Sequence, residues 1–148
     1  MSQTVFPFIS YADTGAAMDW LTRAFGFREQ TRHTDDRGRV MHGELELSGN
    51  VVMVAQPSPH YQGPKRHAQT CKAARRWSAV PWVIDGVLVL VDDVDAHFRR
   101  ARAAGATILT GIEKTGAGRG YRCADCEGHR WMFAQRQVTR KRRRKRRR

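Results

Sequence analysis

The chain has 148 residues, 41% of them hydrophobic, which suits a single domain with one hydrophobic core. It has no run of about 20 apolar residues and no N-terminal signal-peptide pattern, so we expect a cytoplasmic protein without a membrane span. The net charge of +13 comes mainly from a run of nine C-terminal cations; the other residues carry 18 basic and 14 acidic side chains, a net charge of only +4.

The same pattern occurs twice, over residues 9–54 and 87–134. Each copy runs from an apolar segment through an acidic cap, an amphipathic helix and a charged stretch to two further apolar segments. The markers at matching positions are Asp13, Gly26, Gly38 and Gly49 in the first copy and Asp93, Gly105, Gly118 and Gly128 in the second. Such a repeat predicts a βαβββ unit that pairs with its own copy. We therefore expect an α+β fold in which two tandem βαβββ modules form a curved mixed sheet around a central cavity, where a small ligand would bind.

The first module covers about residues 5–55. Asp13 has the chemistry of a helix N-cap, and Gly26 suits the C-cap. The strands expected are Val5–Tyr11, Phe27–Thr34, Val40–Leu47 and Val51–Ala55. The third alternates, with His42, Glu44 and Glu46 on one face, and the fourth is apolar enough to be buried on both faces.

Residues 56–85 form a connector between the modules. Pro64 is well placed to begin a helix that runs to about Trp77 and carries five basic side chains on its surface. A connector of this length suits a lid or binding loop, and packing across the junction between the copies explains it equally well.

The second module covers about residues 86–135. It begins with an apolar strand, Gly86–Val91, which we expect to be buried. Asp93 then caps a helix that ends at Gly105. The remaining strands expected are Thr107–Thr110, Tyr121–Ala124 and Arg130–Ala134.

Residues 136–148 form a polybasic tail that follows the domain of residues 1–135. Its last nine residues, 140–148, are all Lys or Arg, so they repel one another and we expect them to be disordered. Such a run can attract nucleic acid or anionic membrane non-specifically. A solvated appendage is the interpretation we favour, because no nucleic-acid-binding module precedes it.

Three phrases in these copies resemble the glyoxalase/bleomycin-resistance/dioxygenase group, the vicinal oxygen chelate superfamily. They are ISYADTGAAMDWLTRAFGF in the first copy, and VDDVDAHFRRARAAGA and DCEGHRWMF in the second. The resemblance spans about residues 5–135 and implies the paired-module fold. It implies no single activity, because the superfamily includes isomerases, dioxygenases, thiol transferases and non-catalytic drug-binding proteins. Since many relatives are dimers, it also implies a homodimer.

Metal-dependent members of such families carry His or Glu ligands at matching strand positions of the two copies. The corresponding residues here are Phe6, Met53, Gly86 and Met132, none of which suits a hard or borderline divalent cation. A shift of one residue recovers only Asp85. The lone C-x-x-C pair of Cys123 and Cys126 is half of what a structural zinc site needs. We therefore predict no metal and no cofactor.

A metal-free ligand site would combine apolar side chains with a few polar ones on the faces that the two copies turn toward each other. The candidate ligand-binding residues are Phe6, Phe8, Ser10, His42, Glu44, Met53, Leu88, Arg122 and Met132. For His42, Glu44 and Arg122, a place on a solvent-facing surface is at least as plausible as a binding role. His129 lies in the E-G-H-R-W phrase and is interpreted as part of a structural turn. His33, His60, His67 and His97 are expected in loops or on exposed helix faces.

The function favoured by the sequence is metal-independent binding of a small molecule, either an antibiotic or a metabolite. A neutral or anionic ligand suits the net charge of +4. The alternative is a glyoxalase-like lyase or isomerase, or a dioxygenase-like enzyme, with a divalent metal such as Zn, Ni or Mn at a non-standard site. That site would use His42, Glu44 and a partner such as His129.

Overall fold

The computed structural model describes residues 2–82 and 84–137. The polybasic run 140–148 lies outside the described residues. The first module contains β1 (Phe8–Ser10), α1 (Thr14–Phe25), β2 (Arg28–Thr34), β3 (Val40–Leu47) and β4 (Asn50–Ala55). The second contains β5 (Val87–Val91), α4 (Val94–Ala103), β6 (Thr107–Thr115), β7 (Gly118–Ala124) and β8 (Arg130–Gln135). The prediction of two βαβββ modules is therefore confirmed.

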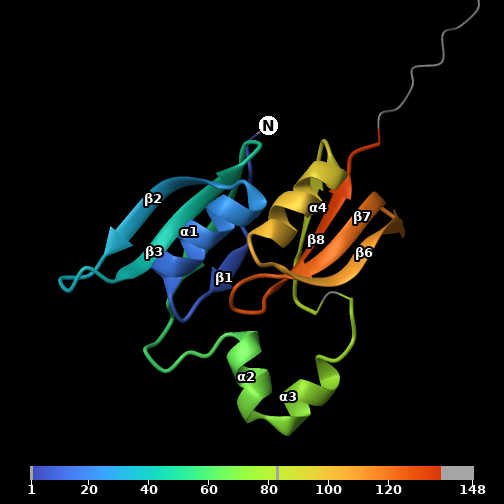
Figure 1. Ribbon diagram of the computed structural model, residues 1–148. Coiled ribbons are helices and arrows are strands. Elements are labelled where there is room, and N and C mark those ends of the chain that lie inside the picture. Colours follow the sequence, from blue (N-terminus) through green and yellow to red (C-terminus); the bar gives the residue numbers. More distant parts are fainter. Residues whose placement is uncertain (1, 83, 138–148) are drawn as a thin grey trace, which may run out of the picture.

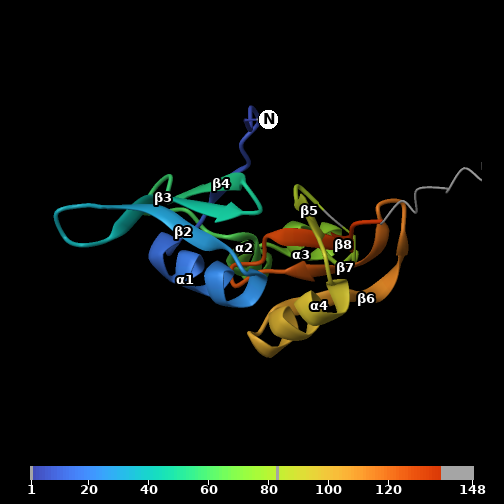
Figure 2. The same cartoon turned by 90° about the horizontal axis from the view of Figure 1, so that it is seen from above.

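Each module forms its own four-stranded mixed sheet. The strand orders are β1-β4-β3-β2 and β5-β8-β7-β6, with β1 parallel to β4 and β5 parallel to β8. The expectation of one curved sheet around a central cavity needs correction, because the two sheets lie side by side and do not close (Figure 2). The physical reason is that the first strands of the two modules pair within their own sheets and not with each other.

Local signals define both long helices. The Asp13 carboxylate accepts a hydrogen bond from the Ala16 amide, and the Asp93 carboxylate accepts one from the Ala96 amide, so each N-terminus is capped as predicted. The first helix ends at Gly26, where φ is 83° and a side chain would be strained. None of the helices in the described part of the chain is long and apolar enough to cross a membrane.

Both helices cover the same side of the two sheets, and the other side is open (Figures 1 and 2). One core therefore fills the space between α1, α4 and both sheets. Its larger members include Tyr11, Trp20, Leu21, Phe25, Leu45, Tyr121, Trp131 and Phe133. The two helices are also linked by polar bonds, since Trp20 Nε1 donates to the Ala104 carbonyl at 2.9 Å and Arg100 Nε donates to the Arg23 carbonyl at 2.9 Å.

Several expected boundaries were wrong. The single connector helix is two short helices, α2 (Pro64–Thr70) and α3 (Lys72–Trp77), because Cys71 is extended with φ −128° and ψ 116°. The two helices project away from the sheets as a pair (Figure 1). β1 is shorter than expected and β6 runs on to Thr115. The first strand of the second module is only half-buried on its core face, and Leu88 and Leu90 are 52% and 39% exposed on the other.

Candidate functional site

The open side of the sheets carries two matching rows of side chains. In the first module, Phe8 pairs with Met53, which pairs with Glu44 on the next strand. In the second module, Leu88 pairs with Met132, which pairs with Arg122. Side chains directly opposite each other on neighbouring strands lie on the same face. Each row therefore combines two apolar side chains with one charged side chain.

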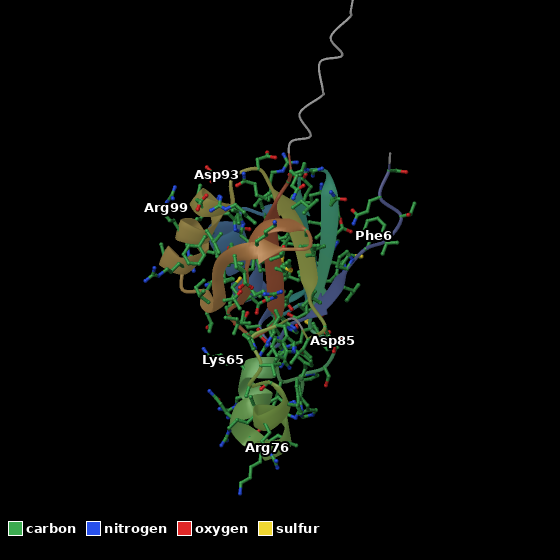
Figure 3. The ribbon with its side chains drawn as sticks, turned by 90° about the vertical axis from the view of Figure 1, so that its right-hand side faces the viewer. Phe6, Lys65, Arg76, Asp85, Asp93 and Arg99 are labelled. Atoms are coloured by element: carbon green, nitrogen blue, oxygen red, sulfur yellow. The ribbon has the colours of Figure 1, made fainter. Side chains whose placement is uncertain are left out.

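Three more of the sequence-predicted residues extend the first row. Ser10 and His42 both pair with Ala55, one pair of positions along from Phe8, and they share the open face. Phe6 precedes β1 and lies on the side away from α4 (Figure 3). The fold thus places all nine predicted residues on the open side, in two groups on separate sheets. It does not place the two groups around one chamber.

Large apolar side chains on this side are unusually exposed. Phe6 is 47%, Phe8 58% and Leu88 52% exposed, whereas the side of the sheets covered by the helices is buried. Several large exposed apolar side chains on one side of a protein are typical of a binding surface for a ligand or another protein. We name the surface made by the nine residues the open face.

The charges of the open face differ between the modules. In the first, Glu46 forms an ion pair with Arg28 at 3.1 Å, and Glu44 has no cation at ion-pair distance among the described residues. In the second, Arg122 forms an ion pair with Glu113 at 2.7 Å. The His42 ring lies 5.9 Å from that of Phe8 and 5.6 Å from that of His33, measured between centroids. The first module is therefore acidic at the position where the second module is basic.

The strand register changes two of the four residues that would correspond to the metal ligands of metal-dependent relatives. Phe8 and Leu88 pair with the two methionines, rather than Phe6 and Gly86. The four side chains remain unsuitable for a divalent metal ion, since an aromatic ring, an alkyl chain and two thioethers offer no oxygen or imidazole ligand. In residues 2–82 and 84–137, no three His, Cys, Asp or Glu side chains cluster in a way that could hold a metal ion.

The C-x-x-C thiols lie in an unreactive environment. Cys123 is buried on the core side of β7, and burial raises its pKa well above the usual value. Burial, together with the nearby carboxylates of Asp125 and Glu127, raises the pKa of Cys126 to about 12. Because the thiolate is the form that binds metals and attacks electrophiles, both thiols are poor candidates for either role.

The turn between β7 and β8 joins the second module to the first. The buried Asp125 carboxylate accepts hydrogen bonds from the Tyr11 hydroxyl at 2.6 Å and from Trp131 Nε1 at 2.9 Å. Glu127 accepts from the backbone amide of Ala12 at 2.7 Å, just before the N-terminus of α1. His129 Nε2 donates to the Ser10 carbonyl at 2.6 Å. This nitrogen already has a backbone acceptor, which agrees with the interpretation of the E-G-H-R-W phrase as structural.

His97 has a structural role that its sequence pattern does not indicate. Its Nε2 donates to the Phe25 carbonyl at 3.0 Å, and its Nδ1 accepts from the Tyr121 hydroxyl at 2.8 Å. Burial lowers the pKa of His97 below its ordinary value, so the ring is held neutral. The expectation of an exposed helix position was wrong because α1 covers this face of α4, a contact that the helix pattern alone does not contain.

Comparisons with known proteins agree with this architecture. The family model of the Glyoxalase/Bleomycin resistance protein/Dioxygenase superfamily matches residues 4–133. An uncharacterised protein of Mycobacterium bovis is 32% identical over 134 residues, which cover 87% of this chain and 80% of that protein.

Solved structures share the fold. TioX from Micromonospora sp. ML1 has a TM-score of 0.65 and 33% identity, with 93% of this chain and 99% of that chain covered. TnmS3, an antibiotic-binding protein from Streptomyces sp. CB03234, has a TM-score of 0.61 and 19% identity, with 93% and 99% covered. Fold, repeat and sequence agree, and the chain belongs to the glyoxalase/bleomycin resistance protein/dioxygenase superfamily.

Proposed function

We propose that this protein binds a small neutral or anionic organic molecule, an antibiotic or a metabolite, against the open face and without a metal ion. The observation that carries the proposal is the composition of the two rows. Each offers two apolar side chains at the positions where metal-dependent relatives are expected to carry ligands, and one charged side chain on the neighbouring strand. Flat ligands bind well to exposed aromatic and thioether side chains, while single charges fix their orientation.

We further propose that two copies form a homodimer that covers the open faces. A ligand on either sheet of a single chain would remain largely in water, because Phe8 and Leu88 are more than half exposed. A two-fold axis would place the first module of each copy against the second module of its partner. Glu44 would then face the partner's Arg122, whereas pairing of like modules would oppose two glutamates or two arginines, which is unfavourable.

The test of metal independence is calorimetric titration of the metal-stripped full chain with Zn²⁺, Ni²⁺, Co²⁺ and Mn²⁺. We expect no binding that depends on the open face. Tight one-to-one binding that disappears in Glu44→Ala or His42→Ala would refute the proposal and favour the lyase, isomerase or dioxygenase alternative. His67→Ala, a change on the exposed connector helix, is the matched control.

The test of the site is a thermal-shift screen of neutral and anionic aromatic compounds, followed by titration of each hit. Phe8→Ala and Met132→Ala should each weaken binding about tenfold, since each removes buried contact worth about 1–2 kcal/mol. Trp82→Ala removes an equally exposed aromatic side chain outside the open face and should change little. Sedimentation of Leu88→Glu should give monomers if the homodimer covers this face; an unchanged dimer would refute that arrangement.

A further inference from the structure

A second candidate site lies apart from the open face, between the α2–α3 pair and the ends of β7 and β8. A cavity of about 470 Å³ separates the helices from the sheet, a size within the range of small-molecule sites. Its walls include Pro64, Lys65, Ala68, Ala74, Trp77, Ile84, Asp85 and Arg130. Figure 3 shows this junction as a narrow waist, with Lys65 on one side and Asp85 on the other.

The walls of this cavity are fixed by backbone hydrogen bonds. Arg130 donates to the Ser78 carbonyl at 2.5 Å and to the Trp82 carbonyl at 2.6 Å, and it also donates to the Val80 carbonyl. These bonds hold the segment after α3 against β8. A guanidinium that donates to three carbonyls of one loop restricts the conformations of that loop. The cavity is therefore already formed in the absence of a ligand.

The other wall is held equally closely. The Lys65 amide donates to the Glu127 carbonyl at 2.9 Å, which joins the first turn of α2 to the turn before β8. Gly128 lies beneath it with φ 93°, and a Cβ there would lie 2.6 Å from the Lys65 nitrogen. Only glycine permits this approach. The connector is therefore attached to the body at both ends of the cavity.

The lining is suited to an aromatic group. Trp77 lines the cavity while remaining 52% exposed, and Ala68 and Ala74 are small lining residues where larger side chains would take up part of the space. Ile84 and Pro64 are also apolar. A half-exposed tryptophan at the edge of an apolar cavity gains burial and stacking when a flat molecule enters.

The charges nearby favour an acidic group on that molecule. Residues 56–84 contain no Asp or Glu but five Lys or Arg. No carboxylate lies at ion-pair distance from Lys65 or Arg66 among the described residues. Lys65 lines this cavity and also a neighbouring one of about 750 Å³, whose walls include Arg66 and His60. Two carboxylates also line the cavity: Asp125, which already accepts four hydrogen bonds, and Asp85, on the opposite side from Lys65. Among the described residues, neither forms an ion pair with Lys65 or Arg66.

We propose that the cavity between α2–α3 and the second sheet binds an aromatic acid, with the ring against Trp77 and the anionic group at Lys65. This site goes beyond the proposed open-face function and does not depend on it. The connector is then a binding element, one of the two roles that its length suggested.

The experiment uses two fluorescent probes on the full chain. 8-Anilinonaphthalene-1-sulfonate is an aromatic anion, and N-phenyl-1-naphthylamine is its neutral counterpart without the sulfonate. Lys65→Gln should weaken the anionic probe about fivefold to tenfold, the range for loss of one partly exposed charged hydrogen bond, and should leave the neutral probe unchanged. Asp85→Asn, which neutralises the opposite charge at the far side of the cavity, should not weaken either probe.

The ring is tested by changes in the cavity wall. Trp77→Ala and the filling substitution Ala68→Leu should both weaken the two probes, while Trp82→Ala, which alters an exposed tryptophan outside the cavity lining, should not. All variants keep residues 140–148, so any attraction of the anion to that run is the same in each. Far-ultraviolet circular dichroism checks that each variant is folded.

Three outcomes would overturn the proposal. One is that the Lys65→Gln variant binds the anionic probe as tightly as the unaltered protein does. Another is absence of saturable binding by the unaltered protein. The third is binding that Phe8→Ala or Met132→Ala abolishes while Trp77→Ala and Ala68→Leu do not, which would place the probes on the open face.

Discussion

Replacement of Asp125 is expected to be among the most destabilising single changes in this protein. Asp125 is 4% exposed, and its carboxylate accepts hydrogen bonds from the Tyr11 hydroxyl, Trp131 Nε1 and the amides of Glu127 and His129. Asp125→Ala removes the acceptor and leaves the hydroxyl and the indole N–H, both on fully buried residues, without a partner. An orphaned buried donor costs about 1–3 kcal/mol. The expected loss in free energy of unfolding is therefore about 3–5 kcal/mol.

Two milder variants separate the contributions. Asp125→Asn keeps one oxygen for the two amides and can donate to Tyr11, but its amide nitrogen cannot accept from Trp131, so we expect a loss of about 1–2 kcal/mol. Tyr11→Phe removes one hydrogen bond and leaves the carboxylate with three donors, so the expected loss is about 1 kcal/mol. Asp36→Ala, in an exposed turn, is the control and should stay within about 0.5 kcal/mol.

Guanidinium chloride unfolding, followed by tryptophan fluorescence, measures these differences as shifts in midpoint at constant slope. A loss below about 1.5 kcal/mol for Asp125→Ala would contradict the reasoning. So would equal losses for Asp125→Ala and Asp125→Asn, because the hydrogen-bond argument requires that the retained oxygen matters.

Three further predictions address packing, pH and the connector. Gly43→Ala should destabilise the protein by about 1–3 kcal/mol, because a Cβ there would lie 2.4 Å from Met18 Sδ. Gly111→Ala places its Cβ in open space and should not destabilise the protein. Equal unfolding midpoints for the two variants would refute this prediction. Folding lowers the pKa of His97, so below about pH 6.5 the native state binds fewer protons than the unfolded one, and the contribution of His97 to stability should be complete above that pH and fall below it. His97→Gln should make the unfolding midpoint depend less on pH between pH 8 and 5. An unchanged dependence of the midpoint on pH would contradict the assignment. Arg130→Ala should release the connector and speed tryptic cleavage at Arg75 and Arg76. Arg119→Ala, which breaks an exposed ion pair with Asp95, should leave the cleavage rate unchanged. Equal cleavage rates in the two variants would show that the three carbonyl bonds of Arg130 do not hold the connector in place.

The sequence by itself determined the modules. Asp13 and Asp93 cap helices through bonds to amides three residues away, and the alternation of Val40–Leu47 places His42 and Glu44 on one face. Such signals depend only on residues that are close in the sequence, so they can be recognised without knowledge of the fold. The same periodicity put all nine candidate ligand-binding residues on one side of the sheets. Whether they bind a ligand remains the proposal to be tested.

Only the tertiary structure decided how the modules meet. An apolar run such as Val87–Val91 reads as buried, but nothing local states that helices cover one face and leave Leu88 exposed on the other. The bond of Tyr11 to Asp125 joins residues 114 positions apart, and that of His97 to Phe25 joins residues 72 apart. Contacts at such separations arise from the packing of α1 and α4 over both sheets. The open face and the neutral histidine follow from that packing, and the cavity under the connector follows from the bonds of Arg130 and Lys65 to distant backbone groups. Burial and the choice of partner are properties of the assembled chain rather than of any segment of it.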